Sequence, residues 1–252
     1  TYDASLVRRV LLEAMQPWSQ STAGHLASSM RMYLRFLVSE GSVAATLIAA
    51  VPSAPQRRLS SLPRYISPED VERAIASCGE NPAGMRDRAI LLLLARLALR
   101  AGDITDLCLG DIDWDRAEIR VAGKSRRQTA LPLPQDVGDA LHAYIARVRP
   151  VIDEDKVFLR TMAPARALAN PGVVSNIAKR ALDRASVRTF AGRGAHVFRH
   201  SQATGLLRSG ADLDVIQALL RHASPSTTAI YAKTDTVMLQ EVAQPWIGGS
   251  GQ

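Results

Sequence analysis

Cysteine is scarce in this chain. Cys78 and Cys108 are the only two cysteines among 252 residues, and neither belongs to a CxxC or Cys/His cluster. The sequence therefore predicts no disulfide framework and no metal site, and it indicates a reducing cytosol. It also lacks a clustered Asp/Glu set of the kind that holds two catalytic metal ions. No cofactor is expected.

Long apolar runs are also missing. The most apolar stretch, Ala89 to Leu99, is interrupted by Arg96 and is far shorter than the roughly 18–20 residues needed to cross a bilayer. We predict a buried helix here and expect no membrane partner. The first residues, Thr1-Tyr2-Asp3, lack methionine and do not resemble a signal peptide, so a processed, trimmed or partial chain is expected.

Positive charge, in contrast, is in excess. The 31 Lys and Arg residues outnumber the 24 Asp and Glu residues and give a formal net charge of +7. Most of the basic residues are arginines, whose planar guanidinium pairs well with phosphate oxygens. Charge alone is compatible with a nucleic acid, a membrane surface or an acidic protein as partner, and at this point all three stay open.

The N-terminal part is predicted to be helical up to a linker. Three helices are predicted, at 6–15, 22–39 and 44–50. The expected apolar faces of the first two are Leu6, Val10, Leu11 and Met15, and Leu26, Met30, Tyr33, Leu34 and Leu37. Gly41 is the expected stop of the second helix. The stretch 51–63 is rich in Pro, Ser and Arg, as interdomain linkers are. We place a domain boundary near residue 60, between a partial helical domain (1–60) and a second domain (61–252).

The second domain is predicted to be mainly α with one small three-stranded antiparallel sheet. Ser67 and Asn170, each followed by proline, are predicted N-caps. Three strands are predicted, and a polar hairpin tip at 123–128 joins the last two. The strands are expected at 111–114, 118–121 and 129–133. Helices are expected at 86–100, 135–148, 196–209 and 212–220, with another that starts at Ser224-Pro225.

Chemistry-bearing residues gather in the C-terminal half. His196 and Arg199 are three apart in a predicted helix and so share a face. His222 lies just beyond a predicted helix end, and Tyr231 follows nine residues later. Taken singly, each residue has an ordinary structural interpretation; Arg100, for example, could simply neutralise a helix C-terminus. The combination is what indicates a site.

Four segments, in order over residues 65 to 235, resemble those of the tyrosine recombinases, the phage-integrase superfamily. The string 100–112, Arg-Ala-Gly-Asp-Ile-Thr-Asp-Leu-Cys-Leu-Gly-Asp-Ile, is similar to the first arginine box. Val121-Ala-Gly-Lys124 resembles the β-hairpin lysine segment, and His196-x-x-Arg199-His200 resembles the second box. The string 219–231, Leu-Leu-Arg-His-Ala-Ser-Pro-Ser-Thr-Thr-Ala-Ile-Tyr, resembles the third. The resemblance implies this family's catalytic domain, after a short or truncated helical core-binding domain.

The resemblance also implies a metal-independent mechanism of DNA cleavage and rejoining. Tyr231 would be the nucleophile and form a 3′-phosphotyrosyl intermediate. The resemblance implies that Arg100 and Arg199 clamp the phosphate and that His222 hydrogen-bonds the same oxygens. It implies Lys124 as the general acid and His196 as the general base. Physical chemistry agrees, because guanidiniums bind phosphoryl oxygens bidentately and an imidazole titrates near neutrality.

Several positions are expected to support the site or to contact DNA. Asp103, where the family commonly has glutamate, is expected to orient neighbouring side chains, and His200 is expected to pack or support. Arg221 replaces the glycine that commonly precedes the third-box histidine, and we expect it to add positive charge beside the phosphate. Phosphate contacts are also predicted for arginines of the N-terminal region and of the hairpin tip: Arg31, Arg35, Arg57, Arg58, Arg126 and Arg127.

The expected function is site-specific recombination of double-stranded DNA by a homo-oligomer, a tetramer on two DNA sites, in the cytoplasm at the nucleoid. Two alternatives stay open: a type IB-like topoisomerase that relaxes DNA without partner exchange, and a non-catalytic DNA-binding relative. The sequence does not indicate the target site, because base readout depends on side chains at a groove surface. Nor does it indicate whether the outcome is integration, excision, resolution or inversion.

Overall fold

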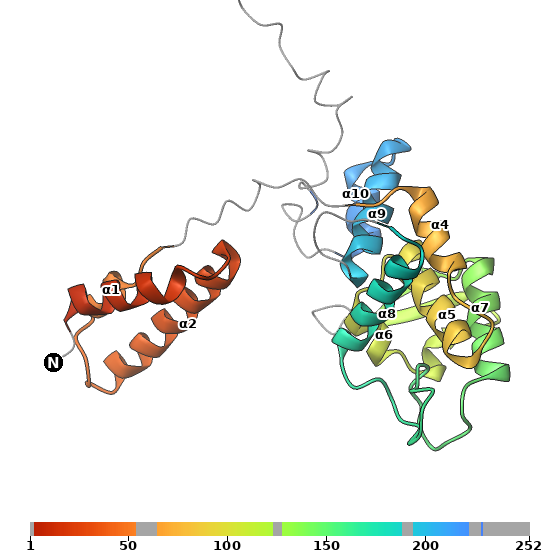
Figure 1. The fold of residues 1–252 in the computed structure, drawn as a ribbon, viewed down its shortest axis with the longest axis horizontal. Helices are drawn as coiled ribbons and strands as arrows, with labels where there is room; N and C mark the ends of the chain where they lie inside the picture. The colour runs from red at the N-terminus through yellow and green to blue at the C-terminus, as the bar shows by residue number, and fades with distance from the viewer. Residues whose placement is uncertain (1–2, 54–64, 123–127, 188–193, 222–227, 229–252) are drawn as a thin grey trace, which may run out of the picture. The chain divides into compact units, whose positions relative to one another are not determined.

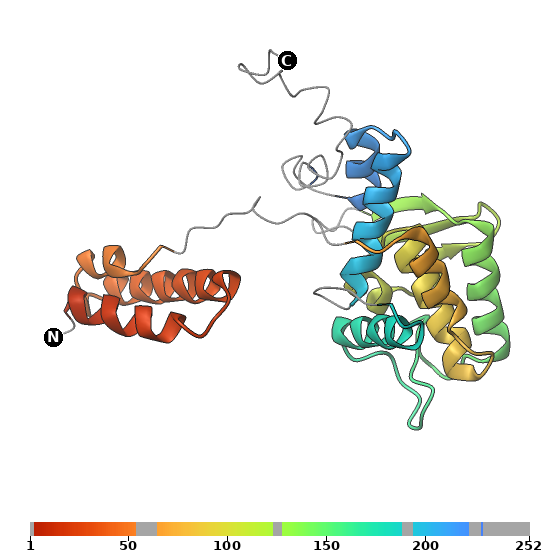
Figure 2. The ribbon, with the colours of Figure 1, turned by 45° about the horizontal axis from the view of Figure 1, so that its top comes forward.

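The fold was analysed in a computed structural model, which describes residues 3–53, 65–122, 128–187, 194–221 and 228 (Figures 1 and 2). The chain divides into two units, Thr1–Ser61 and Leu62–Gln252. The structure is mostly helical with one three-stranded antiparallel sheet, which confirms the predicted fold class. No helix among these residues is long and apolar enough to span a bilayer.

The N-terminal unit is built from three helices, α1 (Ala4–Met15), α2 (Gln20–Ser39) and α3 (Thr46–Ala50). The Ser19 hydroxyl caps α2 by accepting a hydrogen bond from the backbone N–H of Thr22. Gly41 ends the helix with a φ of +70°, a conformation that glycine adopts without strain. All three predicted helices are confirmed. Their shared core consists of Leu11, Met15, Ala23, Ala27, Leu34, Leu47 and Val51.

The predicted apolar faces of α1 and α2 were partly wrong. Leu6 and Val10 of α1 are 41% and 52% exposed, and Tyr33 of α2 is 56% exposed. Helical spacing shows which residues share a face, but the neighbouring helices determine how wide a stripe of that face is covered. In this three-helix unit the covered stripe is narrow, because α1 buries only Leu11 and Met15.

The C-terminal unit contains seven helices longer than a single 3₁₀ turn among its described residues. They are α4 (Pro68–Ala76), α5 (Pro82–Arg96), α6 (Ala101–Asp106), α7 (Gln135–Arg147), α8 (Pro171–Arg184), α9 (Ala195–Arg208) and α10 (Leu213–Leu220). The N-caps predicted at Ser67 and Asn170 are confirmed, since each side chain accepts a backbone N–H of the first turn.

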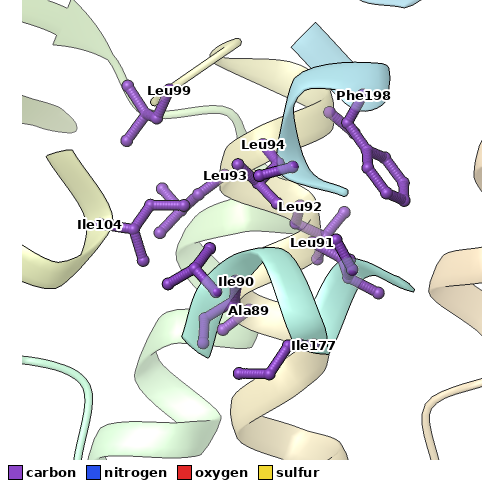
Figure 3. Packing of buried hydrophobic residues seen from close by; sticks show 14 of the residues in the cluster. Ala89, Ile90, Leu91, Leu92, Leu93, Leu94, Leu99, Ile104, Ile177 and Phe198 are labelled. Atoms are coloured by element: carbon purple, nitrogen blue, oxygen red, sulfur yellow. The ribbon is translucent and has the colours of Figure 1, made fainter. Parts of the chain in front are cut away.

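Helix α5 is the centre of this unit. Its residues 89–95 are all buried, and it packs against α4, α7, α8 and α9 (Figure 3). The predicted buried helix is therefore confirmed, but both ends of its predicted range, 86–100, were wrong, since the helix begins at Pro82. The helix ends at Arg96, and Arg100 instead precedes the first residue of α6. Two local features explain the break: Ala98 has a φ of +47°, and the Asp103 carboxylate caps α6 by accepting the backbone N–H of Arg100.

The sheet confirms the three predicted strands. Its strands are β1 (Ile112–Asp113), β2 (Glu118–Ala122) and β3 (Gln128–Pro132), in the order β1-β2-β3, and a short 3₁₀ helix, η1 (Leu109–Asp111), precedes them. In the register of the second pair, Ile119 faces Leu131. Along β2, Ile119 and Val121 are buried and the residues beside them are not, as period-two alternation requires. Of the predicted hairpin tip, residues 123–127 lie outside the described residues, and Gln128 is the first residue of β3.

A small apolar cluster joins the last two helices to the chain after α5. It contains Ala98, which lies between α5 and α6, with Ala203 and Leu207 of α9 and Ile216 and Leu220 of α10. All five residues are buried. Ala98 itself is fully buried. By packing these residues together, the fold brings the end of α10 next to residues 98–100, which are more than a hundred positions away in sequence.

Candidate active site

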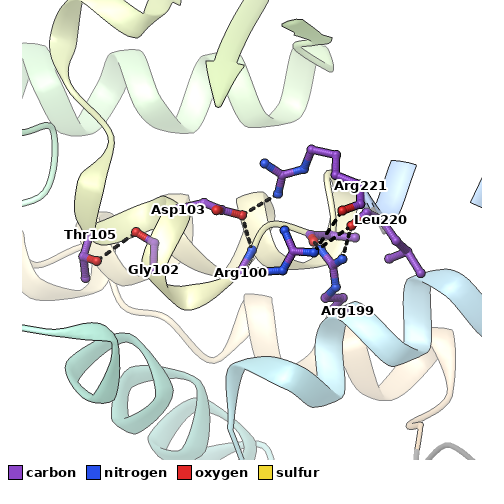
Figure 4. A network of polar contacts seen from close by, with 8 residues as sticks. Arg100, Gly102, Asp103, Thr105, Arg199, Leu220 and Arg221 are labelled. Carbon is purple, nitrogen blue, oxygen red and sulfur yellow. Dashed lines mark hydrogen bonds and ion pairs between the residues drawn. The ribbon is translucent and has the colours of Figure 1, made fainter. Parts of the chain in front are cut away.

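Three chain segments meet where α6 begins and α10 ends. Arg100 comes from the start of α6, Arg199 from the middle of α9, and Leu220 and Arg221 from the end of α10 (Figure 4). The two arginines that the first and second boxes contribute are therefore neighbours in space, although 98 other residues lie between them in sequence.

Arg199 is the more deeply buried of the two arginines, with only 4% of its surface exposed. Its Nη1 donates to the carbonyl oxygen of Ala98 and its Nη2 to that of Leu220. A guanidinium in this environment requires such acceptors, because burial of an unpaired charge is costly. Hydrogen bonds to the two carbonyls fix the plane of the guanidinium.

Arg100 donates from its Nη2 to the carbonyl oxygens of Leu220 and Arg221, both at 3.2 Å. The carbonyl of Leu220 thus accepts hydrogen bonds from both arginines (Figure 4). Burial lowers the pKa of the Arg100 guanidinium; Asp103 opposes this effect and the nearby charge of Arg221 adds to it. An arginine nevertheless stays protonated, so the site carries concentrated positive charge.

Asp103 connects the same segments. Its Oδ2 accepts the backbone N–H of Arg100 at 2.8 Å and also forms an ion pair with the Nη2 of Arg221. The side chains of Asp103 and Arg221 are only 11% and 5% exposed. We expected Asp103 to orient its neighbours, and these contacts give it the geometry to do so.

Arg221 lies inside the site and adopts an unusual backbone conformation. Its φ and ψ are +49° and +48°, the left-handed region that favours glycine. Within the described part of the chain, its Nε and Nη1 are buried and have no hydrogen-bond partner. The predicted phosphate contact of Arg221 stays a prediction, but the guanidinium faces Asp103 rather than an open surface.

His196 and His200 lie one turn apart on α9, with ring centroids 6.4 Å apart. Burial lowers the pKa of His196, and the charges of Arg199 and Arg100 lower it further. Burial also lowers the pKa of His200, to about 4, with smaller contributions from His196 and Arg199. Both imidazoles are therefore neutral at neutral pH, which is the form that a general base requires.

Several predicted residues lie outside the described part of the chain: Arg57, Arg58, Lys124, Arg126, Arg127, His222 and Tyr231. Their predicted roles stay predictions. In the N-terminal unit, Arg35 is exposed, whereas Arg31 donates from its Nη2 to the carbonyls of Val51 and Pro52, at 3.2 and 3.0 Å. Arg31 thus has a structural contact that the sequence analysis did not foresee.

Sequence reasoning missed the backbone groups of the site. The carbonyls of Ala98 and Leu220 hold Arg199, and their residue types give no indication of it. An alanine in the left-handed region is uncommon, so nothing at position 98 predicts the turn that aims its carbonyl at Arg199. The ion pair between Asp103 and Arg221 was also not predicted, because it joins two distant segments.

Comparison with known proteins identifies the family of this chain. Residues 64–237 match the phage integrase family. The chain is 42% identical to the putative integrase/recombinase y4rA of Sinorhizobium fredii (strain NBRC 101917 / NGR234), over 88% of this chain and 54% of that protein. It is 32% identical to the tyrosine recombinase XerC of Thermodesulfovibrio yellowstonii (strain ATCC 51303 / DSM 11347 / YP87), over 89% of this chain and 75% of that protein.

Two solved structures share the fold. One is the XerH site-specific recombinase bound to a palindromic difH substrate in a post-cleavage complex. It matches with a TM-score of 0.80 and 20% sequence identity, over 98% of this chain and 73% of the XerH chain. The other is a lambda integrase dimer bound to a COC′ core site. It matches with a TM-score of 0.71 and 17% sequence identity, over 93% of this chain and 81% of the integrase chain.

The protein thus has the fold of DNA-breaking recombinases and two box arginines that meet in space. The chain belongs to the phage integrase family, the tyrosine recombinases. It spans 54% and 58% of the length of the two Sinorhizobium relatives that it matches.

Proposed function

We propose that this chain carries the catalytic domain of a site-specific recombinase that cleaves and rejoins duplex DNA without a metal, through a phosphotyrosyl intermediate. One observation carries the proposal: Arg100 and Arg199 both donate an N–H to the carbonyl of Leu220. Two guanidiniums that reach one carbonyl oxygen are close enough to share one phosphate, which a guanidinium binds through paired N–H groups.

The chemical step balances with the residues of this chain alone. The hydroxyl oxygen of Tyr231 attacks phosphorus while the bond from phosphorus to the 5′-oxygen breaks. His196 takes the tyrosine proton, and Lys124 donates a proton to the leaving 5′-oxygen. Arg100, Arg199 and His222 stabilise the additional negative charge on the non-bridging oxygens. Religation reverses the step, because the phosphotyrosyl ester retains the bond energy.

His196 suits the role of base for a structural reason. It lies on the same helix as Arg199, three residues earlier, and its lowered pKa keeps its imidazole neutral and able to accept a proton. The surrounding guanidiniums also favour the tyrosinate form of a nearby phenol. This positive field and the base act together on a hydroxyl whose unperturbed pKa is about 10.

The substrate in this proposal is double-stranded DNA, bound by a tetramer around two sites in the cytoplasm at the nucleoid. The fold neighbours include a lambda integrase dimer on a core site and a lambda integrase tetramer on a Holliday junction, which supports this choice. Arg35, Arg57 and Arg58 of the N-terminal region and Arg126 and Arg127 of the hairpin contact backbone phosphates.

A covalent capture experiment tests the proposal. The probe is a library of short duplexes with randomised sequence and nicks in one strand, so that a cleaved end diffuses away and the intermediate accumulates. We expect adducts that survive denaturing electrophoresis, and mass spectrometry should place the nucleotide on Tyr231. Arg147→Lys, an exposed change on α7, serves as a control and should form the same adduct.

Three outcomes would contradict the proposal in different ways. Equal capture by Tyr231→Phe would show that the nucleophile is wrong. Sequence-specific binding with no adduct under any condition would favour the non-catalytic relative. Relaxation of supercoiled plasmid by the monomer, with no preference for sequence, would favour the topoisomerase.

A further inference from the structure

Arg221 combines a strained backbone with a buried ion pair. The left-handed conformation is less favourable than the right-handed one for an L-residue with a β-carbon, and glycine has no such cost. Arg221 nevertheless occupies it, immediately after α10 and immediately before His222. Its side chain turns back to Asp103, more than a hundred residues away in sequence. An unfavourable conformation of this kind persists when surrounding contacts hold it.

Those contacts form a closed ring of three residues. The backbone N–H of Arg100 donates to Asp103 at 2.8 Å, and the Nη2 of Arg221 pairs with the same carboxylate oxygen. The ring closes where the Nη2 of Arg100 donates to the carbonyl oxygen of Arg221 at 3.2 Å (Figure 4). The start of α6 and the end of α10 are thus tied together at two points.

We propose that Arg221 is a positioning residue for the phosphate-clamping arginines. By holding the end of α10 against α6 through Asp103, it keeps the carbonyls of Leu220 and Arg221 where Arg100 and Arg199 donate to them. This inference rests on the proposed function for its effect on catalysis. Its structural part, the restraint of the Arg100 guanidinium, holds for the protein without DNA.

The geometry favours this role over a direct contact between Arg221 and a DNA phosphate. One guanidinium nitrogen is already paired with Asp103, and the side chain is 5% exposed. A phosphate-binding arginine would show itself in the salt dependence of DNA affinity, because each neutralised phosphate adds about 0.9 to the slope of log K against log salt. A positioning residue leaves that slope unchanged.

The first test is made without DNA. Nuclear magnetic resonance relaxation at the Arg100 Nε–H bond reports the order of its guanidinium on the picosecond to nanosecond timescale. We expect a clear fall in the order parameter in Arg221→Gly, because glycine fits the backbone but cannot reach Asp103. Arg149 is the internal control: its guanidinium is held by the carbonyls of Lys156 and Val157, away from residue 221, and should not change.

The second test is single-turnover cleavage of a duplex selected from the randomised library. We expect Arg221→Gly to cleave about 10-fold to 100-fold more slowly, as displaced catalytic groups do, with an unchanged salt slope of binding. Arg221→Lys keeps a cation for Asp103 and should recover part of the rate. Ser186→Gly, which relieves a φ of +55° on the loop after α8, is the matched control and should cleave at the wild-type rate.

Asp103→Asn provides an independent break in the ring. The amide oxygen of the asparagine still accepts the backbone N–H of Arg100, so the cap of α6 is retained. The ion pair with Arg221 is lost, because an amide carries no charge. The double variant with Arg221→Gly should be no slower than the slower single variant, because both changes remove the same interaction. Additive losses would overturn the inference.

Two further results would overturn it. One is an unchanged Arg100 order parameter together with a wild-type cleavage rate in Arg221→Gly. The other is a smaller salt dependence of DNA binding: if the slope of log K against log salt is lower by about one in Arg221→Gly while cleavage stays at the wild-type rate, Arg221 is a phosphate contact instead. If the wild-type protein cleaves no DNA, the proposed function fails, and the relaxation measurement alone still decides whether Arg221 restrains Arg100.

Discussion

Backbone carbonyls accept hydrogen bonds from both clamp arginines. Arg199 donates to Ala98 and Leu220, and Arg100 to Leu220 and Arg221. A carbonyl satisfies an N–H of a guanidinium without neutralising its positive charge. The Asp103 carboxylate also belongs to this group, and its partners are the Arg100 backbone and the Arg221 side chain.

Substitution of Arg199 by lysine tests this arrangement. Lysine carries the charge but is a compact donor that cannot span the Ala98 and Leu220 carbonyls in one plane. We expect Arg199→Lys to slow single-turnover cleavage at least about 100-fold, comparable to loss of one oxyanion-hole donor. Unfolding in urea should show a loss of about 1–3 kcal/mol, since a buried carbonyl loses its donor. A cleavage rate within twofold of wild type would contradict this account.

The histidines of α9 predict how stability depends on pH. The pKa of His200 is lowered to about 4, so between that value and the ordinary value of about 6.5 the unfolded chain binds a proton that the folded chain does not. The free energy of unfolding is therefore highest above about pH 6.5. It decreases as the pH falls toward 4, because protonation of His200 favours the unfolded chain. The lowered pKa of His196 acts in the same direction.

The measurement is the urea midpoint at about pH 7.5 and about pH 5, compared between wild type and His200→Gln. Wild type should lose more stability on acidification than the variant, which has one fewer titrating group. Parallel losses in both proteins would show that His200 is not the cause.

At the scale of single elements, the sequence predicted most of the secondary structure, but it placed α5 at 86–100, whereas the helix spans Pro82–Arg96. Helices α4 and α8 have strong local capping signals at Ser67 and Asn170, and β2 alternates buried and less buried residues. The end of α5 has no such signal. Ala98 and Leu99 are good helix formers, so their residue types do not predict the turn; burial of Ala98 in a cluster with Ala203 and Leu220 adds to the local features that end the helix.

Helix α5 should tolerate truncation of its buried side chains poorly. Leu93 is fully buried in the centre of the helix that supports α7 and α9 (Figure 3). We expect Leu93→Ala to destabilise the protein by about 2–5 kcal/mol, through lost burial and a remaining cavity. Val215→Ala on α10, where the side chain is 55% exposed, is the control and should stay within about 0.5 kcal/mol of wild type. Similar losses for both variants would contradict the central role of α5.

At the scale of the whole molecule, the chain contains separate apolar cores in its two units. The core of the N-terminal unit is formed by seven buried residues, whereas the C-terminal unit has the large cluster around α5 and a smaller one at α10. A domain of about 60 residues buries a smaller fraction of its surface on folding than a larger domain does, and its stability is marginal. The composition of 51–63 indicated a linker, but no sequence pattern predicts how much stability each core provides.

Calorimetry should therefore record two transitions. Leu34 belongs to the N-terminal core and is 6% exposed, so Leu34→Ala should lower the midpoint of the first transition and leave the second unchanged. A single transition that moves as a whole in this variant would show that the two units unfold together.

The candidate site could be predicted in its residue types but not in its supporting contacts. Arg100, His196 and Arg199 stand in segments whose order and spacing match the family, and the fold brings Arg100 and Arg199 together. The Leu220 carbonyl that both arginines share depends on the packing of α10 against residue 98. That packing is a long-range property, and no local pattern encodes it.

The structure of the trapped covalent adduct tests the central claim most directly. The account predicts that the phosphorus joined to Tyr231 has non-bridging oxygens within hydrogen-bond distance, about 2.7–3.2 Å, of nitrogens of both Arg100 and Arg199. A phosphotyrosyl group that contacts neither guanidinium, or only one of them, would contradict it.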